Sequence, residues 1–146
     1  MTLMPDVNVL VYAHRQDETW HEAYRGWLEE VLDGPQPFVL SVLVAVGFVR
    51  VVTNARIYPD PTPLAVAFAA VERLMQHPRC RVATPGSGHI EQVARLSQAV
   101  GATGKLVADA QHAAVAIAEG ATWVTRDGDF ARFEHHGLRW QHLVLT

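Results

Sequence analysis

The sequence predicts an α/β fold in which a central, mostly parallel sheet is flanked by helices. Two observations support this prediction. Helical and extended segments alternate along the chain, which is the pattern that parallel strands joined by crossover helices produce. The chain has 146 residues, of which 49% are hydrophobic, so it is the size of one compact domain with a substantial core. We therefore expect a single domain over residues 1–146.

The first part of the chain predicts a short strand followed by two helices. Leu3–Asp6 is expected to be a strand, and Asn8–His14 a helix. The next stretch, DETWHEAYRGWLEEVLD, has large apolar residues at helical spacing: Trp20, Tyr24, Trp27, Leu28 and Val31. Asp17 is its expected N-cap, and Gly34 with Pro35 ends it.

The middle segment PFVLSVLVAVGFVRVVTN is apolar almost throughout, so periodicity alone does not separate strand from helix. We divide it at Ser41, which leaves Phe38–Leu40 as a strand and Val42–Thr53 as a buried helix that Ser41 caps. After the loop NARIYPDP, Thr62 is expected to cap a helix with Pro63 at its first position. That helix carries an apolar stripe: Leu64, Ala67, Phe68, Val71, Leu74 and Met75.

The second half of the chain continues the alternation of strands and helices. Its expected elements are a strand at Arg81–Thr84, a helix at His89–Val100, an alanine-rich helix in LVADAQHAAVAIAEG, a strand at Thr122–Thr125, a loop at RDGDF, and a last strand at Trp140–Leu143. Gly101 and Gly120 are placed to end the two helices.

Composition excludes several classes of protein. The net charge of −3 and the pI near 6.2 do not fit a protein that coats nucleic acid through a basic surface. A single cysteine, Cys80, cannot form an internal disulfide, which fits a reducing compartment. No signal peptide is visible, and the longest uncharged run, Gly34 to Val49, is shorter than the roughly 20 residues that span a bilayer. We expect a cytoplasmic protein without a membrane segment.

Four aspartates fall where a parallel sheet binds ligands, which is beyond the carboxyl ends of its strands. Asp6 ends the first strand, Asp127 and Asp129 follow the strand TWVT, and Asp109 lies in the first turns of the alanine-rich helix, at the border of its apolar stripe. Each also has a structural explanation: Asp6 as a helix N-cap, Asp127 and Asp129 as turn residues, and Asp109 as an acid that favours a helix N-terminus.

Convergence of these acids would require a cation. Carboxylates that meet in one crevice repel one another and have raised pKa values unless a positive charge lies between them. Hard oxygen ligands suit Mg²⁺ or Mn²⁺, and no spacing of cysteine and histidine indicates zinc. The eight histidines are expected to be surface or locally hydrogen-bonded residues.

The opening PDVNVLVYA, the late segment VADAQHAAVAIAEGATWVTRDGDF and the order of elements between them resemble PIN-domain ribonucleases, and more closely the VapC-like toxins of type II toxin–antitoxin pairs. The resemblance covers nearly the whole chain. It implies a PIN-like three-layer α/β/α fold and a metal-dependent endoribonuclease that hydrolyses RNA phosphodiester bonds at an acidic pocket holding Mg²⁺ or Mn²⁺. It also implies a homodimer and a VapB-like antitoxin that covers the site.

Carried over residue by residue, the resemblance assigns catalytic and metal-binding roles to Asp6, Asp109 and Asp127. Asp129 matches a trailing polar position and is a supporting metal ligand. Asn8 stands at the polar position that follows the first acid.

One position departs from the family pattern. The family usually has a glutamate in the helix after the second strand, with a basic residue three positions later; here Gly47 and Arg50 stand there. The departure puts the number of bound metals in doubt, and we favour one firmly held ion. Arg50, Lys105 and Arg126 are candidates for contacts with phosphate or RNA, although surface or ion-pair roles are equally open.

Two alternative functions remain at this point. Loss of the glutamate is compatible with a PIN-like binding module that no longer cleaves RNA. A Mg²⁺-dependent phosphatase also begins with an acid after its first strand, but it needs a second Asp where this chain has Asn8, and a lysine, for which only Lys105 is available.

Overall fold

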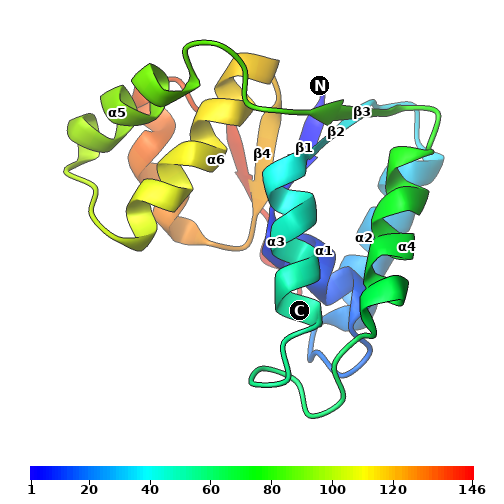
Figure 1. The fold of residues 1–146 in the computed structure, drawn as a ribbon. Helices are drawn as coiled ribbons and strands as arrows, with labels where there is room; N and C mark the ends of the chain where they lie inside the picture. The colour runs from blue at the N-terminus through cyan, green and yellow to red at the C-terminus, as the bar shows by residue number, and fades with distance from the viewer.

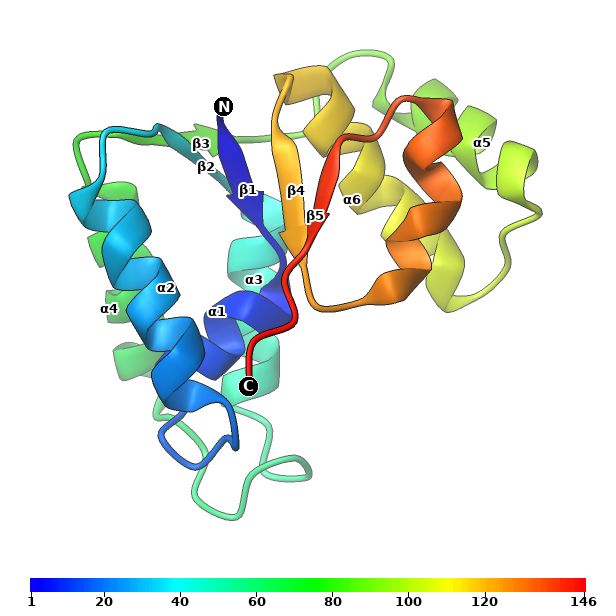
Figure 2. The same cartoon turned by 180° about the vertical axis from the view of Figure 1, so that it is seen from behind.

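A five-stranded sheet forms the centre of the computed structural model, which describes residues 1–146. The strands are β1 (Leu3–Pro5), β2 (Phe38–Ser41), β3 (Cys80–Ala83), β4 (Thr122–Thr125) and β5 (Trp140–His142). Their order in the sheet is β3-β2-β1-β4-β5, and every neighbouring pair is parallel. The carboxyl ends of all five strands therefore meet at one edge, which is the lower edge of the sheet in Figure 2.

Helices lie on both sides of this sheet, so the predicted three-layer α/β/α fold is confirmed. They are α1 (Val7–His14), α2 (His21–Asp33), α3 (Val42–Val52), α4 (Leu64–Met75), α5 (His89–Val100), α6 (Lys105–Glu119) and the 3-10 helix η1 (Gly128–His136). In Figure 1, α3 and α6 lie in front of the sheet, and Figure 2 shows α2 on the opposite side. No helix combines the length and the apolar character that a membrane span needs.

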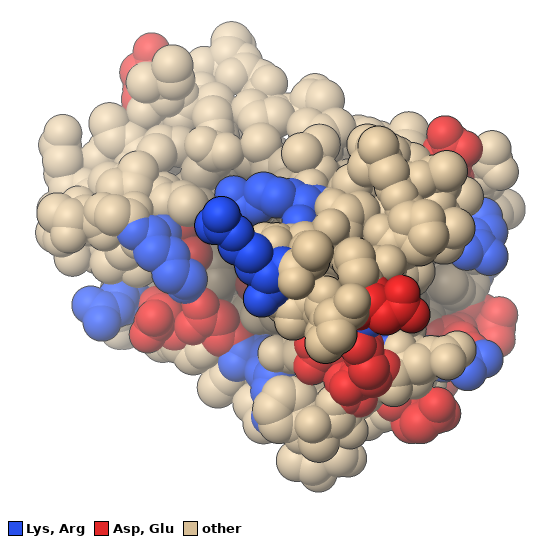
Figure 3. Space-filling model, turned by 60° about the horizontal axis from the view of Figure 1, so that its bottom comes forward, with Lys and Arg blue, Asp and Glu red and all other residues tan.

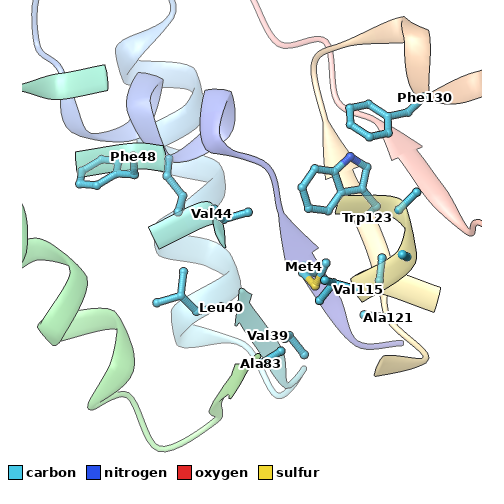
Figure 4. Packing of buried hydrophobic residues seen from close by; sticks show 14 of the residues in the cluster. Met4, Val39, Leu40, Val44, Phe48, Ala83, Val115, Ala121, Trp123 and Phe130 are labelled. Carbon is cyan, nitrogen blue, oxygen red and sulfur yellow. The ribbon is translucent and has the colours of Figure 1, made fainter. Parts of the chain in front are cut away.

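The core consists of two clusters of apolar side chains, which pack on the sheet and against the helices that cover it. The larger cluster, part of which is drawn in Figure 4, includes Met4 and Trp123, both fully buried. The smaller cluster contains Leu3 of the same strand and Tyr24 of α2. Adjacent residues of β1 thus point to opposite faces, as a strand requires. Each large side chain buried in this way stabilises the fold by about 1.5–3 kcal/mol.

The local predictions at two helix ends are confirmed. β2 ends at Ser41 and α3 begins at Val42, because the Ser41 hydroxyl accepts a hydrogen bond of 3.2 Å from the backbone N–H of Leu43. Gly101 and Gly120 end α5 and α6 with φ angles of 65° and 62°, a left-handed conformation that favours glycine.

Two predicted helix caps were wrong, because Arg15 binds both side chains. The second helix begins at His21 rather than at Asp17, and the carboxylate of Asp17 instead accepts hydrogen bonds of 2.8 and 2.6 Å from the guanidinium of Arg15. The hydroxyl of Thr62 also accepts from Arg15, at 3.2 Å, and α4 begins at Leu64 without a side-chain cap.

One further expectation needs correction, and the predicted apolar stripe of α4 is only partly buried. The segment RDGDF is not a plain loop, because η1 begins at Gly128. On α4, Ala67 and Val71 are buried, but three members of the expected apolar stripe are more than 40% exposed: Leu64, Phe68 and Met75. This helix therefore leaves an apolar face open to solvent.

Candidate active site

A pocket of about 570 Å³ opens at the carboxyl edge of the sheet. Asp6, Asp109 and Asp127 all line it, although they come from the end of β1, from α6 and from the segment after β4. Figure 3 turns this end of the molecule toward the viewer and shows acidic and basic side chains next to one another across it. The structure thus brings together the three aspartates that the sequence predicted to converge.

Asp6 is both the N-cap of α1 and a wall of the pocket. Its Oδ1 accepts a hydrogen bond of 2.6 Å from the backbone N–H of Val7, and its Oδ2 accepts one of 2.6 Å from the hydroxyl of Thr125. Burial raises the pKa of Asp6 to about 6; the two hydrogen bonds oppose that shift, and the charges of Asp109 and Asp127 add to it. The cap and site interpretations therefore both hold for this carboxylate.

Asp109 and Asp127 share a cation supplied by the protein itself. The Lys105 ammonium lies 3.1 Å from Oδ2 of Asp109 and 2.9 Å from Oδ2 of Asp127. Burial raises the pKa of Asp109, although Lys105 opposes the shift. Burial also favours a higher pKa for Asp127. The hydrogen bond from the backbone N–H of Asp129 and the contact with Lys105 outweigh burial, so the pKa of Asp127 is below its ordinary value. The hydrogen bond to Asp127 is the main reason that the pKa of Lys105 is raised.

Thr125 connects the polar groups at the ends of β1 and β4. It is fully buried, and besides donating to Asp6 its hydroxyl oxygen accepts from the backbone N–H of Asp127 at 2.9 Å. The side-chain amide of Asn8 lies 3.4 Å from the same hydroxyl, and its carbonyl oxygen accepts from the N–H of Arg126 at 3.4 Å. Sequence reasoning missed Thr125; the signal was its place at the end of β4, two residues before Asp127.

The three basic candidates lie in different surroundings. Arg50 and Lys105 line the pocket, and the side chain of Arg50 is exposed. Arg126 does not line it. Its guanidinium lies 3.6 Å from the centre of the Trp20 ring and donates a hydrogen bond of 2.6 Å to the carbonyl of Leu145. These contacts hold the C-terminal segment against α2.

Asp129 and Gly47, which the sequence analysis also singled out, lie differently with respect to the pocket. Asp129 is exposed and does not line the pocket; its backbone N–H donates to Asp127 at 2.9 Å. Gly47 does line the pocket, and a Cβ at this position would lie 3.0 Å from Cγ2 of Val7. A glutamate there would therefore require Val7 to move.

The donor set suits a hard divalent cation by its chemistry. Three carboxylates line one pocket, and an ammonium already neutralises part of their charge. No three side chains of His, Cys, Asp or Glu are close enough in this arrangement to bind one ion together. Lys105, which is 70% exposed, lies where a cation shared by Asp109 and Asp127 would lie, so a metal ion binds both carboxylates only after this side chain has moved.

Four more residues of the pocket escaped sequence reasoning: Tyr12, Glu18, Tyr58 and His112. Tyr58 donates a hydrogen bond of 2.7 Å to Oε1 of Glu18. His112 is stacked on Trp123, with ring centres 5.1 Å apart, and burial lowers its pKa to about 4, so the imidazole is neutral at pH 7. The place of His112 three residues after Asp109 puts both on one side of α6 and was the available signal.

Comparison with known proteins adds two kinds of finding. The family model for the PIN domain matches residues 3–135. Ribonuclease VapC43 of Mycobacterium tuberculosis strain H37Rv is 44% identical over 140 residues, covering 96% of this chain and 94% of the relative. Ribonuclease VapC31 of the same strain is 39% identical over 128 residues, covering 88% of this chain and 90% of the relative.

Solved structures share the fold at lower identity. VapBC2 from Rickettsia felis, bound to a DNA fragment from its promoter, superposes with a TM-score of 0.67 at 18% identity and covers 97% of this chain and 98% of that chain. VapC20 of M. tuberculosis, described as a toxin that cleaves the sarcin–ricin loop, gives a TM-score of 0.67 at 19% identity, with coverage of 97% and 98%.

Proposed function

Since the chain belongs to the PIN-domain family and within it to the VapC ribonucleases, we propose that it is a metal-dependent endoribonuclease that hydrolyses RNA phosphodiester bonds. The observation that carries the proposal is the convergence of Asp6, Asp109 and Asp127 on one pocket. An accumulation of buried carboxylates with raised pKa values is costly for folding, and it is typical of functional sites.

Asp6, Asp109 and Asp127 would hold Mg²⁺, or Mn²⁺ in its place. When bound, the ion lowers the pKa of a water molecule and stabilises the charge of the phosphate under attack. Because Gly47 stands at the usual glutamate position, we propose one firmly held ion, with Asp129 at most in support.

The residues around the acids have separate proposed roles. Val7 and Thr125 hold both oxygens of Asp6, so this carboxylate is fixed before substrate binds. Lys105 contacts Asp109 and Asp127, and if a metal ion replaced it there, its ammonium would become available to a phosphate oxygen. Arg50 is a second phosphate contact, because it is exposed at the pocket.

Substitution of the acids tests the proposal. Asp6→Asn and Asp109→Asn remove one negative charge each and are expected to reduce Mg²⁺-dependent cleavage of single-stranded RNA by more than about 100-fold, which exceeds the effect of most changes to groups that only orient a metal ligand. Circular dichroism checks that both variants are folded. Asp33→Asn, at the exposed end of α2, is the matched control and should cleave as the unmodified protein does. Full activity in both active-site variants would refute the assignment.

Gly47 favours a second candidate, a PIN-like binding module that has lost cleavage together with the family glutamate. The two functions are separated by incubating RNA with the protein and Mg²⁺ or Mn²⁺, with and without EDTA. Cleavage that EDTA abolishes supports the nuclease, whereas binding of RNA without cleavage supports the module.

A VapB-like antitoxin is the proposed protein partner. Its support is that the fold neighbours include VapBC complexes from R. felis and Haemophilus influenzae, and that α4 exposes an apolar face of the kind that binds other proteins. We also propose a homodimer and a cytoplasmic location, where an RNA substrate is available.

A further inference from the structure

We propose that the pocket contains, beside the three aspartates, a separate site for one nucleobase, formed by Tyr12, Glu18 and Tyr58, and that this site selects guanine. The inference rests on the proposed RNA cleavage and adds the base preference of the substrate. We call these three residues the base site.

The base site lies at the other end of the same pocket from the acids. Tyr12 is in the last turns of α1, Glu18 in the loop between α1 and α2, and Tyr58 in the loop between α3 and α4. In Figures 1 and 2 both loops lie together at the lower end of the molecule. Asp6 begins α1, so the helical rise of about 1.5 Å per residue puts Tyr12 about 9 Å further along the axis. That separation suits a base attached to a phosphate at the acids.

Glu18 has different side-chain partners from the three aspartates. The charges of Asp109 and Asp127 add to the rise in the pKa of Asp6. The pKa of Tyr12 is raised first by burial and then by the charge of Glu18, with a smaller contribution from Asp6, and Glu18 accepts the hydrogen bond of Tyr58. Glu18 is thus a fourth carboxylate of the pocket, beside the three proposed metal ligands.

The carboxylate of Glu18 is held in a fixed place. The Tyr58 hydroxyl donates to Oε1 of Glu18 at 2.7 Å, and Tyr58 is only 6% exposed, so the donor is anchored in the core. The backbone N–H of Glu18 donates to the carbonyl of Arg15 at 3.2 Å, and the N–H of His21 donates to the carbonyl of Glu18 at 3.2 Å. Both the side chain and the backbone of Glu18 are therefore restrained before any ligand binds.

Arg15 joins the two loops that form the base site. It is 9% exposed, and its guanidinium lies 4.0 Å from the centre of the Tyr58 ring. It donates to both carboxylate oxygens of Asp17 in one loop and to the carbonyl of Asp60, at 2.8 Å, in the other. Preorganisation of this kind lowers the entropy cost of ligand binding.

The chemistry of the base site favours guanine. An ionised glutamate only accepts hydrogen bonds. Guanine presents two adjacent donors on its Watson–Crick edge, N1–H and the 2-amino group, which match the two oxygens of a carboxylate. Adenine and cytosine place an acceptor next to their amino group, and uracil has a single N–H between two carbonyls. The half-buried ring of Tyr12 supplies an aromatic wall on which a base can stack.

The first test measures cleavage of short uridine oligonucleotides that carry one guanosine, or an inosine or adenosine in its place. Inosine lacks only the 2-amino group. The unmodified protein should cleave beside guanosine roughly 10-fold or more faster than beside the other two, judged by kcat/KM with Mg²⁺. In Glu18→Gln, which keeps an oxygen for Tyr58 but replaces the second acceptor by a donor, this ratio should fall to near one. Glu22→Gln, an exposed residue of α2, is the matched control and should keep the ratio.

The second test measures binding of the same oligonucleotides by fluorescence anisotropy in the Asp6→Asn background, where cleavage is not needed. The guanosine preference should appear there too and disappear when Glu18→Gln is added. Cleavage that depends on Asp6 but shows no base preference, or a preference that Glu18→Gln leaves intact, overturns the base site while the nuclease stands. A guanosine preference in binding without cleavage by the unmodified protein supports the base site and overturns the nuclease. Absence of both overturns both.

Discussion

At the scale of single residues, Asp6 shows how one carboxylate serves structure and chemistry together. It directly follows β1, its carboxylate caps α1, and the same carboxylate faces the pocket. Its two oxygens are held by Val7 and Thr125, yet burial still raises its pKa to about 6. The fold therefore keeps this acid charged at neutral pH against a cost in stability.

This cost gives a prediction for unfolding. The pKa of Asp6 is about 6 in the folded protein, against 3.8 for an aspartate in an unfolded chain, so the folded state binds the proton more tightly. The charge of Asp6 therefore lowers stability above pH 6, by roughly 3 kcal/mol, and this penalty fades as the pH falls toward 4. In EDTA, Asp6→Asn should unfold at a higher temperature than the unmodified protein at pH 7.5, and the difference should shrink at pH 5. A less stable variant at pH 7.5 would contradict this account.

Lys105 gives a second prediction at this scale. Because its ammonium lies between Asp109 and Asp127, it competes with a divalent ion for both carboxylates. Lys105→Met should bind Mn²⁺ about 10-fold more tightly at pH 8, measured by isothermal titration calorimetry, and should cleave RNA more slowly if the ammonium contacts phosphate. Lys105→Arg keeps the charge and is the control. Weaker Mn²⁺ binding by Lys105→Met would show that the lysine assists the metal site instead.

At the scale of elements, the sheet and the helices follow from local signals, whereas the loops do not. Ser41 divides an apolar run correctly because its cap is a contact with Leu43, two residues away. Asp17 and Thr62 are equally good caps by composition, but Arg15 binds both of them. The contact between Arg15 and Asp60 spans 45 positions, and no local pattern encodes it.

The residues of the site likewise fall into those that the sequence predicts and those that it does not. The meeting of Asp6, Asp109 and Asp127 was predictable, because the carboxyl ends of parallel strands share an edge. The place of Glu18 beside Tyr58 was not, because it depends on how two irregular loops pack. Loops of this kind carry the specificity that a family pattern does not include.

The role of Arg15 in connecting the two loops can be tested by substitution. Arg15→Met deletes a buried guanidinium that is hydrogen-bonded to both loops, and should lower the free energy of unfolding by about 2–4 kcal/mol in urea titrations. Arg25→Met removes an exposed i,i+4 pair with Glu29 and should cost less than about 0.5 kcal/mol. Equal effects of the two substitutions would show that Arg15 does not stabilise the loops.

At the scale of the whole molecule, α4 leaves an apolar face uncovered. The sequence predicts its apolar stripe, of which Leu64, Phe68 and Met75 are exposed, and this leaves apolar surface for another chain. Periodicity identifies which residues share a face and does not show whether a neighbour covers it.

Association is therefore expected. In size-exclusion chromatography with light scattering, the protein alone should have the mass of two chains, as proposed above. Its monomer mass is 16.1 kDa, so a dimer of about twice that value is readily resolved. A single monomeric species across the micromolar range would remove the homodimer from the proposal.

The contacts of the C-terminal segment have a practical consequence for anyone who makes this protein. The carbonyl of Leu143 accepts from Tyr24 at 2.6 Å and that of Leu145 from Arg126 at 2.6 Å, while Arg126 directly precedes Asp127. Trimming the last four residues would remove one hydrogen-bond acceptor of a guanidinium that stands next to a proposed metal ligand. Met1 is 75% exposed and makes none of these contacts, so a purification tag at the N-terminus leaves them intact.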